Sequence, residues 1–371
     1  MKISAIILAA GYSSRMGSMK MLLPMGVCNM LERTIGSFLA AGIEEVFVVT
    51  GFEAEKIEQC AAGLRVHTVR NTSFAEGMFS SIQAGVRALP QDVDAFFVMP
   101  GDIPFVDPGI IRELAAGITP ENMILYPRFE GRKGHPPLIS AKLRDEIQQA
   151  DIQLAGGLKG VLSRHENMAA YLNFADPALL MDLDYQEEYR KAACFSAMHC
   201  PDEAACHVLL RKHRTPERVI SHCVAVAKVA RILAEAVCRA EVQIDTNLTC
   251  SAALLHDICR TAGKEHPAAG AALLKDLGQP KVADIIACHM DLEPANQPKE
   301  RELVYLADKL VKDDRVISFR EHMQMSKEAF RENSIAQREI QRRLDAASQI
   351  AHAIEKLTGM SLSEILDIPE I

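Results

Sequence analysis

The spacing of hydrophobic residues divides the chain into two halves. In the first half, short apolar runs rich in β-branched and aromatic residues alternate with stretches of helical spacing. The apolar runs predict strands at Ile3–Ala9, Glu45–Thr50, Leu64–Val69, Ala95–Met99, Met123–Tyr126 and Pro137–Ile139. The other stretches predict helices at Met30–Ala41, Glu53–Ala62, Glu76–Leu89 and Ile110–Ala116. Such alternation predicts βαβ units and an α/β domain with a mostly parallel sheet.

The second half shows helical spacing and no convincing strand pattern. We expect helices at Arg218–Ala240, Leu248–Ile258, Ala268–Leu277, Val282–His289 and Glu302–Val311, and a helix or helix pair at Ser326–Leu357. Thr215 is the expected N-cap of the first of these helices, with Pro216 at its first position. We therefore predict a Rossmann-like α/β domain in residues 1–192, a linker in 193–203 and an all-α domain in 204–371.

Length and charge fit this division and exclude some partners. A chain of 371 residues is long enough for two domains, each with its own core. The net charge is −8 and acidic residues outnumber basic ones in both halves, which argues against binding to a nucleic-acid backbone. Trp is absent, so aromatic stacking on single strands is also disfavoured.

The termini and cysteines predict a cytoplasmic protein that has no membrane partner. We find no secretory signal and no run near the roughly 20 apolar residues that a spanning helix needs. The ten cysteines form no CxxC pair, which favours reduced thiols. Cys194, Cys200 and Cys206 recur near His199 and His207, but this spacing matches no known zinc pattern.

A loop of small residues follows the first predicted strand and carries the strongest local signal. It reads Leu8-Ala9-Ala10-Gly11-Tyr12-Ser13-Ser14-Arg15-Met16-Gly17-Ser18-Met19-Lys20. Small residues let backbone N–H groups close around phosphate oxygens, while Arg15 and Lys20 supply positive charge. The plainer alternative is a tight turn with a solvated Arg and Lys. Residues 101–104 also follow a strand, so both loops should open onto one cleft at the carboxyl edge of the sheet.

This loop resembles the L-A-A-G-x-S-x-R-M-G-x-x-K signature of molybdenum-cofactor-type nucleotidyltransferases, which are NTP transferases. Three further stretches are similar to the same family: residues 71–85, Gly101-Asp102-Ile103-Pro104, and Gly134-His135-Pro136. Asp182-Leu183-Asp184-Tyr185 is similar to its D-x-D-T-P segment near the end of the domain, although Tyr185 and Gln186 replace the Thr and Pro.

The resemblance implies roles for individual residues. It implies nucleotide contacts from Leu8, Ala9, Ala10, Gly11, Ser13, Ser14, Asn71, Ser80 and Ser81. It implies catalytic roles for Arg15, Lys20 and Asp102. It further implies a Mg²⁺ ion held by Asp102 and Asp184, with Asp182 as the alternative second ligand.

The reaction implied is nucleotidyl transfer from an NTP to a small phosphorylated acceptor, with release of pyrophosphate. CTP and a molybdopterin-type acceptor are the favoured pair. GTP as donor, and a sugar or alcohol phosphate as acceptor, remain alternatives. The resemblance also implies a molybdoenzyme or a cofactor-handling protein as partner.

Histidines and aspartates recur at helical positions in the second half. His222, the His256-Asp257 pair, His266, His289 and Asp308 come from separate predicted helices or from their ends. Any one of them alone would more often be an ordinary core or surface residue. Together they supply the nitrogen and oxygen ligands that suit a divalent transition metal.

This set resembles the H…HD…D pattern of HD-domain metal-dependent phosphohydrolases. The resemblance implies Mn²⁺ or Fe²⁺ on His222, His256, Asp257 and Asp308, with His266 and His289 able to hold a second ion. Many such domains read H-D-I-G-K, whereas this chain reads His256-Asp257-Ile258-Cys259-Arg260. The phosphate-contacting role is therefore open between Arg260 and Lys264. A regulatory domain that senses a nucleotide without hydrolysis is the alternative.

Overall fold

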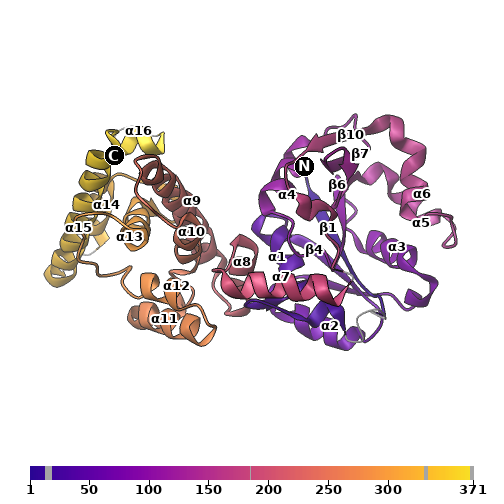
Figure 1. Ribbon diagram of the computed structural model, residues 1–371, viewed down its shortest axis with the longest axis horizontal. Helices are drawn as coiled ribbons and strands as arrows, with labels where there is room; N and C mark the ends of the chain where they lie inside the picture. Colours follow the sequence, from indigo (N-terminus) through magenta and orange to yellow (C-terminus); the bar gives the residue numbers. More distant parts are fainter. Residues whose placement is uncertain (13–18, 184, 330–332, 368–371) are drawn as a thin grey trace. The chain divides into compact units, whose positions relative to one another are not determined.

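The computed structural model describes residues 1–12, 19–183, 185–329 and 333–367 (Figure 1). The chain divides into two compact units, Met1–Lys212 and His213–Ile371. Within the described ranges, no helix combines the length and the apolar character needed to cross a membrane.

The first unit is built on a mixed, mostly parallel sheet. Its strands are β1 (Ile3–Ala9), β2 (Pro24–Met25), β3 (Cys28–Asn29), β4 (Glu45–Thr50), β5 (His67–Arg70), β6 (Ala95–Pro100), β7 (Ile124–Phe129), β8 (Arg132–Lys133), β9 (Leu138–Ser140) and β10 (Ala169–Asn173). The main sheet has the order β10-β7-β9-β6-β1-β4-β5, with β8 paired to β7. β1 runs parallel to both β4 and β6, and β9 is antiparallel to its two neighbours. The predicted α/β fold with a mostly parallel sheet is confirmed.

Helices cover both faces of this sheet (Figure 1). They are α1 (Met30–Ala40), α2 (Ala54–Ala61), α3 (Met78–Ala88), α4 (Pro108–Gly117), α5 (Arg144–Gln149), α6 (Leu158–Leu162), α7 (Gln186–Met198) and α8 (Glu203–Lys212). Strand β1 alternates between the faces, because Ala5 and Ile7 pack with α1 and α4 whereas Ile6 and Leu8 pack with α3. All four side chains are buried, so β1 lies in the middle of the core.

One predicted strand starts later than expected. Residues 64–69 were expected to form it, but β5 begins at His67. Leu64 instead closes a 3₁₀ turn, and Arg65 adopts a left-handed conformation with φ of 56°. The apolar pattern therefore includes the buried end of the preceding turn as well as the strand.

Helix α8 packs against the sheet-bearing unit. It contacts α1, and Lys212 Nζ lies 2.9 Å from a carboxylate oxygen of Glu32. Arg112 on α4 also pairs with Glu203 at 3.0 Å. The first compact unit therefore extends to Lys212, and the predicted start of the all-α domain at residue 204 lies inside α8.

The contact between α1 and α8 leaves no room for a side chain at Gly36. A Cβ there would lie 2.5 Å from the carbonyl oxygen of Ala204 and 2.8 Å from a methyl carbon of Val208. We expect Gly36→Ala to destabilise the first unit by about 1–3 kcal/mol despite the better helix propensity of Ala. Urea unfolding would measure this. Gly63→Ala is the control, because its Cβ would meet only Lys212 Cγ at 4.0 Å. Equal stability of the two variants would contradict tight packing here.

His207 is a buried histidine on α8. Neither of its ring nitrogens has a hydrogen-bond partner in the described structure. Burial, assisted by the positive charges of Arg211 and Arg112, lowers the pKa of His207 from 6.5 to about 4. The folded state therefore holds this ring neutral, whereas the unfolded chain binds a proton below pH 6.5.

This difference predicts acid sensitivity. The contribution of neutral His207 is fully present above pH 6.5 and is lost as the pH falls from 6.5 through about 4. We expect His207→Leu to make the unfolding free energy of the first unit less dependent on pH, by about 2–3 kcal/mol between pH 7.5 and 4.5. Urea titrations of both proteins at the two pH values measure it. Parallel losses in the two proteins would show that His207 does not titrate in this way.

The second unit is helical. Its helices are α9 (Glu217–Arg239), α10 (Thr246–Leu255), α11 (His266–Asp276), α12 (Pro280–Ile286), α13 (Glu300–Leu310), α14 (Phe319–Ala329), α15 (Ser334–Thr358) and α16 (Leu362–Leu366). Helix α9 contacts α10, α13, α15 and α16 and forms the centre of this unit. The expected helical segment 326–357 corresponds to α15 and to only the last residues of α14, and the start of α14 at Phe319 was not predicted.

Two details of the second unit differ from expectation. The N-cap of α9 is Pro216, and the hydroxyl of Thr215 donates to the carbonyl of Ile258 at 3.1 Å instead of capping the helix. A short hairpin joins β11 (Val311–Lys312) to β12 (Arg315–Val316). Its strands are too short to produce a detectable alternation of polar and apolar residues.

Candidate active sites

The candidate transferase site lies at the carboxyl ends of β1 and β6. The backbone N–H of Gly101 donates to the carbonyl of Leu8 at 3.0 Å, which ties the ends of the two strands together. A Cβ on Gly101 would lie 3.0 Å from that carbonyl oxygen and 2.9 Å from the sulfur of Met21. A side chain at position 101 would require the neighbouring atoms to shift, so glycine favours this close approach, which places Asp102 next to the end of β1.

Asp102 and Lys20 form an ion pair at this edge. Lys20 Nζ lies 2.7 Å from Asp102 Oδ2, and the lysine side chain is buried. Asp102 Oδ1 is also buried and has no hydrogen-bond partner among the described residues. A buried carboxylate oxygen without a partner costs free energy unless a cation or a donor approaches it. Its chemistry fits Mg²⁺, which prefers oxygen ligands.

The described chain that leads up to the expected second metal ligand passes beside Asp102 as far as Leu183. The N–H of Leu183 donates to the backbone carbonyl of Asp102 at 3.2 Å, so the chain around Asp182 passes this site. Asp182 itself is exposed. Asp184 lies outside the described residues, as do Ser13, Ser14 and Arg15.

Asn71, Ser80 and Ser81 are joined in a buried network near the end of β5. The side-chain amide of Asn71 donates to Ser80 Oγ at 2.8 Å and to Ser81 Oγ at 3.0 Å. Ser80 donates in turn to backbone carbonyls of Ser73 and Gly77. The network joins Asn71 to two adjacent serines that follow it by nine and ten positions. Their predicted contact with a nucleotide remains a prediction.

In the second unit, the predicted metal ligands converge from separate elements. His222 projects from the first half of α9, and Asp308 comes from α13. His256 and Asp257 directly follow α10. His266 is the first residue of α11, and His289 follows α12. The fold thus gathers all six predicted residues at one place.

Backbone carbonyls orient the four imidazoles. The Nδ1 atoms of His222, His256, His266 and His289 donate to backbone carbonyls at 2.9, 2.7, 2.6 and 2.7 Å, respectively. A carbonyl can only accept, so each neutral ring carries its proton on Nδ1 and presents an unprotonated Nε2. Rings held in this way are typical of metal-binding histidines.

The Nε2 atoms point toward two carboxylates. Asp308 Oδ1 lies 3.2 Å from His222 Nε2 and 3.5 Å from His256 Nε2. Asp257 Oδ1 lies 2.9 Å from His266 Nε2 and 3.6 Å from His289 Nε2. Ligand atoms of His222, His256 and Asp308 lie within 4.8 Å of one another, and so do those of His256, Asp257 and His289. The two groups share His256, so the six residues form one continuous cluster.

Several features of this cluster fit a bound cation. His256 Nε2 is buried without a hydrogen-bond partner among the described residues. The Nε2 atoms of His266 and His289 lie only 3.0 Å apart although both Nδ1 atoms already donate. Asp257 Oδ1 is likewise buried without a hydrogen-bond partner among the described residues, because the unprotonated Nε2 atoms of His266 and His289 cannot donate to it. The donor set fits one or two divalent transition metals.

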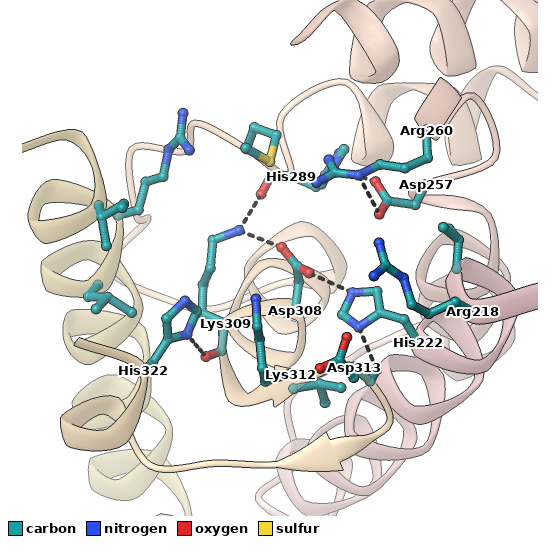
Figure 2. A pocket seen from close by; sticks show the side chains of 16 residues that line it. Arg218, His222, Asp257, Arg260, His289, Asp308, Lys309, Lys312, Asp313 and His322 are labelled. Atoms are coloured by element: carbon teal, nitrogen blue, oxygen red, sulfur yellow. Dashed lines mark hydrogen bonds and ion pairs between the residues drawn. The ribbon is translucent and has the colours of Figure 1, made fainter. Parts of the chain in front are cut away.

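The cluster forms one wall of a pocket of about 270 Å³ (Figure 2). Positively charged side chains also line this pocket, namely Arg218, Arg260, Lys309, Lys312 and Arg343. Arg260 lies 3.6 Å from Asp257, and Lys309 pairs with Asp308. Lys264, the other residue considered for phosphate contact, does not line the pocket. The site therefore combines metal ligands with a positively charged opening.

Sequence reasoning missed Arg218, Lys312, His322 and Arg343 as pocket residues. A signal was available for Arg218, which precedes His222 by four residues and so shares its helix face. His322 and Arg343 come from α14 and α15, which are distant in sequence from the metal ligands. Only the tertiary structure brings them to the pocket.

Comparison with known proteins finds a domain match in each of the two units. Residues 5–168 match the MobA-like NTP transferase domain, and residues 219–313 match the HD domain. The chain is 28% identical over 189 residues to the molybdenum cofactor cytidylyltransferase of Escherichia coli, which covers 50% of this chain and 93% of that protein. It is 32% identical over 124 residues to the CMP-5'-(3-aminopropyl)phosphonate synthase of Streptomyces rubellomurinus, which covers 31% of this chain and only 19% of that protein.

A solved structure of a nucleotidyl transferase from Methanothermobacter is similar with a TM-score of 0.47 and 24% identity, over 53% of this chain and 98% of that one. The two domain matches coincide with the two sites, since Asp102 and Lys20 fall in the first and the His–Asp cluster falls in the second. The chain therefore joins a MobA-like NTP transferase domain to an HD domain.

Proposed function

We propose that the first unit transfers a nucleotidyl group from CTP to a molybdopterin-type phosphorylated acceptor, releasing pyrophosphate. This proposal rests on the ion pair of Lys20 with Asp102, and on Asp102 Oδ1, which has no hydrogen-bond partner among the residues that the structure describes. Both groups lie where ligands bind in parallel α/β sheets, beyond the carboxyl ends of the strands. The similarity to a molybdenum cofactor cytidylyltransferase supports the choice of CTP and of this acceptor.

Each residue has a defined task in this reaction. An acceptor phosphate oxygen forms a bond to the α-phosphorus of CTP while the bond to pyrophosphate breaks. Both reactants are anionic, so alignment and neutralisation of charge supply most of the catalysis. Asp102, with Asp184 or Asp182, would hold Mg²⁺, which supplies Lewis acidity toward the phosphate oxygens. Lys20 and Arg15 would offset the charge that develops on the phosphates.

The test is pyrophosphate release from each of the four NTPs with molybdopterin, a sugar phosphate and an alcohol phosphate as acceptors. We expect CTP with the molybdopterin acceptor to give the highest kcat/KM. Preference for GTP, or for a sugar or alcohol phosphate, would replace the substrate pair but retain the reaction. Absence of pyrophosphate release with every pair would contradict the transferase proposal.

We propose that the second unit hydrolyses a phosphoester at the His–Asp cluster. The convergence of four unprotonated Nε2 atoms on Asp257 and Asp308 carries this proposal. His222, His256, Asp257 and Asp308 would hold Mn²⁺ or Fe²⁺, with His266 and His289 at a second position. The metal supplies Lewis acidity for the phosphate and for the attacking water. Arg260, at the edge of the cluster, would bind and orient the phosphate oxygens.

Elemental analysis and a phosphatase assay test this second activity. We expect the purified full-length protein to contain a divalent transition metal and to hydrolyse p-nitrophenyl phosphate or bis(p-nitrophenyl) phosphate. EDTA should remove the activity and Mn²⁺ should restore it. A protein that holds metal but hydrolyses no phosphoester would instead be a sensor.

A further inference from the structure

The HD pocket contains two positively charged side chains that are not engaged elsewhere. Arg260 and Lys309 pair with the metal-ligating aspartates, and Arg343 Nε lies 3.5 Å from Asp291. Arg218 and Lys312, by contrast, make no hydrogen bond or ion pair with any side chain that the structure describes. Both are exposed, so their guanidinium and ammonium groups are available to a ligand.

Arg218 and Lys312 are held next to the metal ligands. Arg218 lies one helical turn before His222 on α9, a spacing that puts the two Cβ atoms about 5–6 Å apart on the same helix face. Lys312 lies on β11, directly after the helix that carries Asp308. Figure 2 shows both positively charged groups pointing into the pocket beside His222 and Asp308. The two positive charges therefore face the same pocket as the predicted metal ligands.

Helix α15 supplies an apolar wall of the same pocket. Ile340 and Leu344 on this helix line the pocket, and Leu344 is buried. The hydroxyl of Tyr305 on α13 donates to the carbonyl of Arg343 at 3.1 Å, which fastens the helix to the unit. The residues of this wall lie outside residues 219–313, the part of the chain that matches the HD domain. An apolar wall suits carbon atoms of a ligand better than inorganic phosphate.

We propose that the HD pocket takes a small organic phosphate with at least two anionic groups. One phosphoryl group lies at the His–Asp cluster, and Arg218 and Lys312 bind the second anionic group. The organic part lies against Ile340 and Leu344. The pocket volume of about 270 Å³ limits the ligand to a small molecule. This inference rests on the proposed metal site of the second unit, and it adds the ligand class and two specificity-determining residues.

Binding of two non-hydrolysable probes tests the inference. Calorimetry with the full-length, Mn²⁺-loaded protein compares methylenediphosphonate, which has two anionic groups, with methylphosphonate, which has one. We expect the first to bind at least about tenfold more tightly, because one charge-assisted contact contributes about 1.5–3 kcal/mol and tenfold corresponds to about 1.4 kcal/mol. In the double variant Arg218→Gln, Lys312→Gln, the two affinities should fall within about twofold of each other.

The control variant is Arg231→Gln with Lys281→Gln. Arg231 lies on the same helix as Arg218, both control residues are exposed, and neither lines the pocket. The control variant should prefer methylenediphosphonate as strongly as the original protein does. Because both proteins contain the same first unit, the comparison also corrects for any binding of this probe there. Metal content is measured before and after each titration, because a diphosphonate can extract metal.

The outcomes separate the two proposals. An undiminished preference in the Arg218/Lys312 variant, with metal retained, would overturn the second anion subsite. Equal affinities of the original protein for the two probes, together with metal-dependent hydrolysis of p-nitrophenyl phosphate, would also overturn the subsite while the proposed function stands. Absence of bound metal and of hydrolysis would overturn both.

Discussion

Full-length protein that carries His256→Ala together with Asp257→Ala is expected to lose its divalent metal and its phosphoesterase activity. Both residues belong to one set of potential metal ligands, together with His289. His256 also belongs to the second set, together with His222 and Asp308. Their removal takes a nitrogen and an oxygen ligand from the centre of the cluster. We expect metal content below about a tenth of an equivalent and a fall in hydrolysis of at least about 100-fold.

The same protein should retain nucleotidyl transfer, because Lys20 and Asp102 belong to the other compact unit. His352→Ala is the matched control, since His352 is an exposed histidine of α15 and does not line the pocket. Circular dichroism would verify that the double variant is folded. A folded double variant that keeps a full equivalent of metal would show that the cluster is a hydrogen-bonded core feature and not a metal site.

Asp102→Asn is expected to reduce nucleotidyl transfer by at least about 100-fold while the protein remains folded. The substitution keeps the shape of the side chain but removes the charge that pairs with Lys20 and the carboxylate oxygen offered to Mg²⁺. Pyrophosphate release at millimolar Mg²⁺ measures the effect. Hydrolysis of p-nitrophenyl phosphate by the second unit should be unchanged and serves as an internal standard.

Asp145→Asn provides the matched control for the loss of one negative charge. Asp145 is an exposed residue of α5 on the same unit, with no ion pair among the described residues. Its transfer rate should remain within about twofold of the original. Turnover by Asp102→Asn at the rate of this control would exclude Asp102 as a ligand of the catalytic metal.

Several features of this protein followed from local sequence alone. Strands β1 and β4 have the bounds that the apolar runs predicted, because a buried strand in a parallel sheet is apolar on both faces. The class of each unit followed in the same way, and the two signatures by themselves indicated where both candidate sites lie along the chain. His222, His256 and Asp308 could be selected together because their pattern matches a family, although nothing local distinguishes a ligand from a core histidine.

Long-range packing decided the rest. The sequence places residue 204 after a linker, but α8 packs on α1 with Gly36 at the contact, so the first unit runs to Lys212. Helix pairing of this kind depends on which surfaces meet across more than 160 residues of chain, and local periodicity contains no such information.

The same reason applies to the HD pocket. The sequence by itself determined which residues of α9, of α13 and of the segment after α10 are predicted as ligands, since their types and order match a known pattern. Only the tertiary structure decided that Lys312 and the α15 residue Leu344 share a pocket with them. Ligand chemistry is a property of residue types, whereas the shape and charge of a pocket arise from side chains that meet only when the chain is folded.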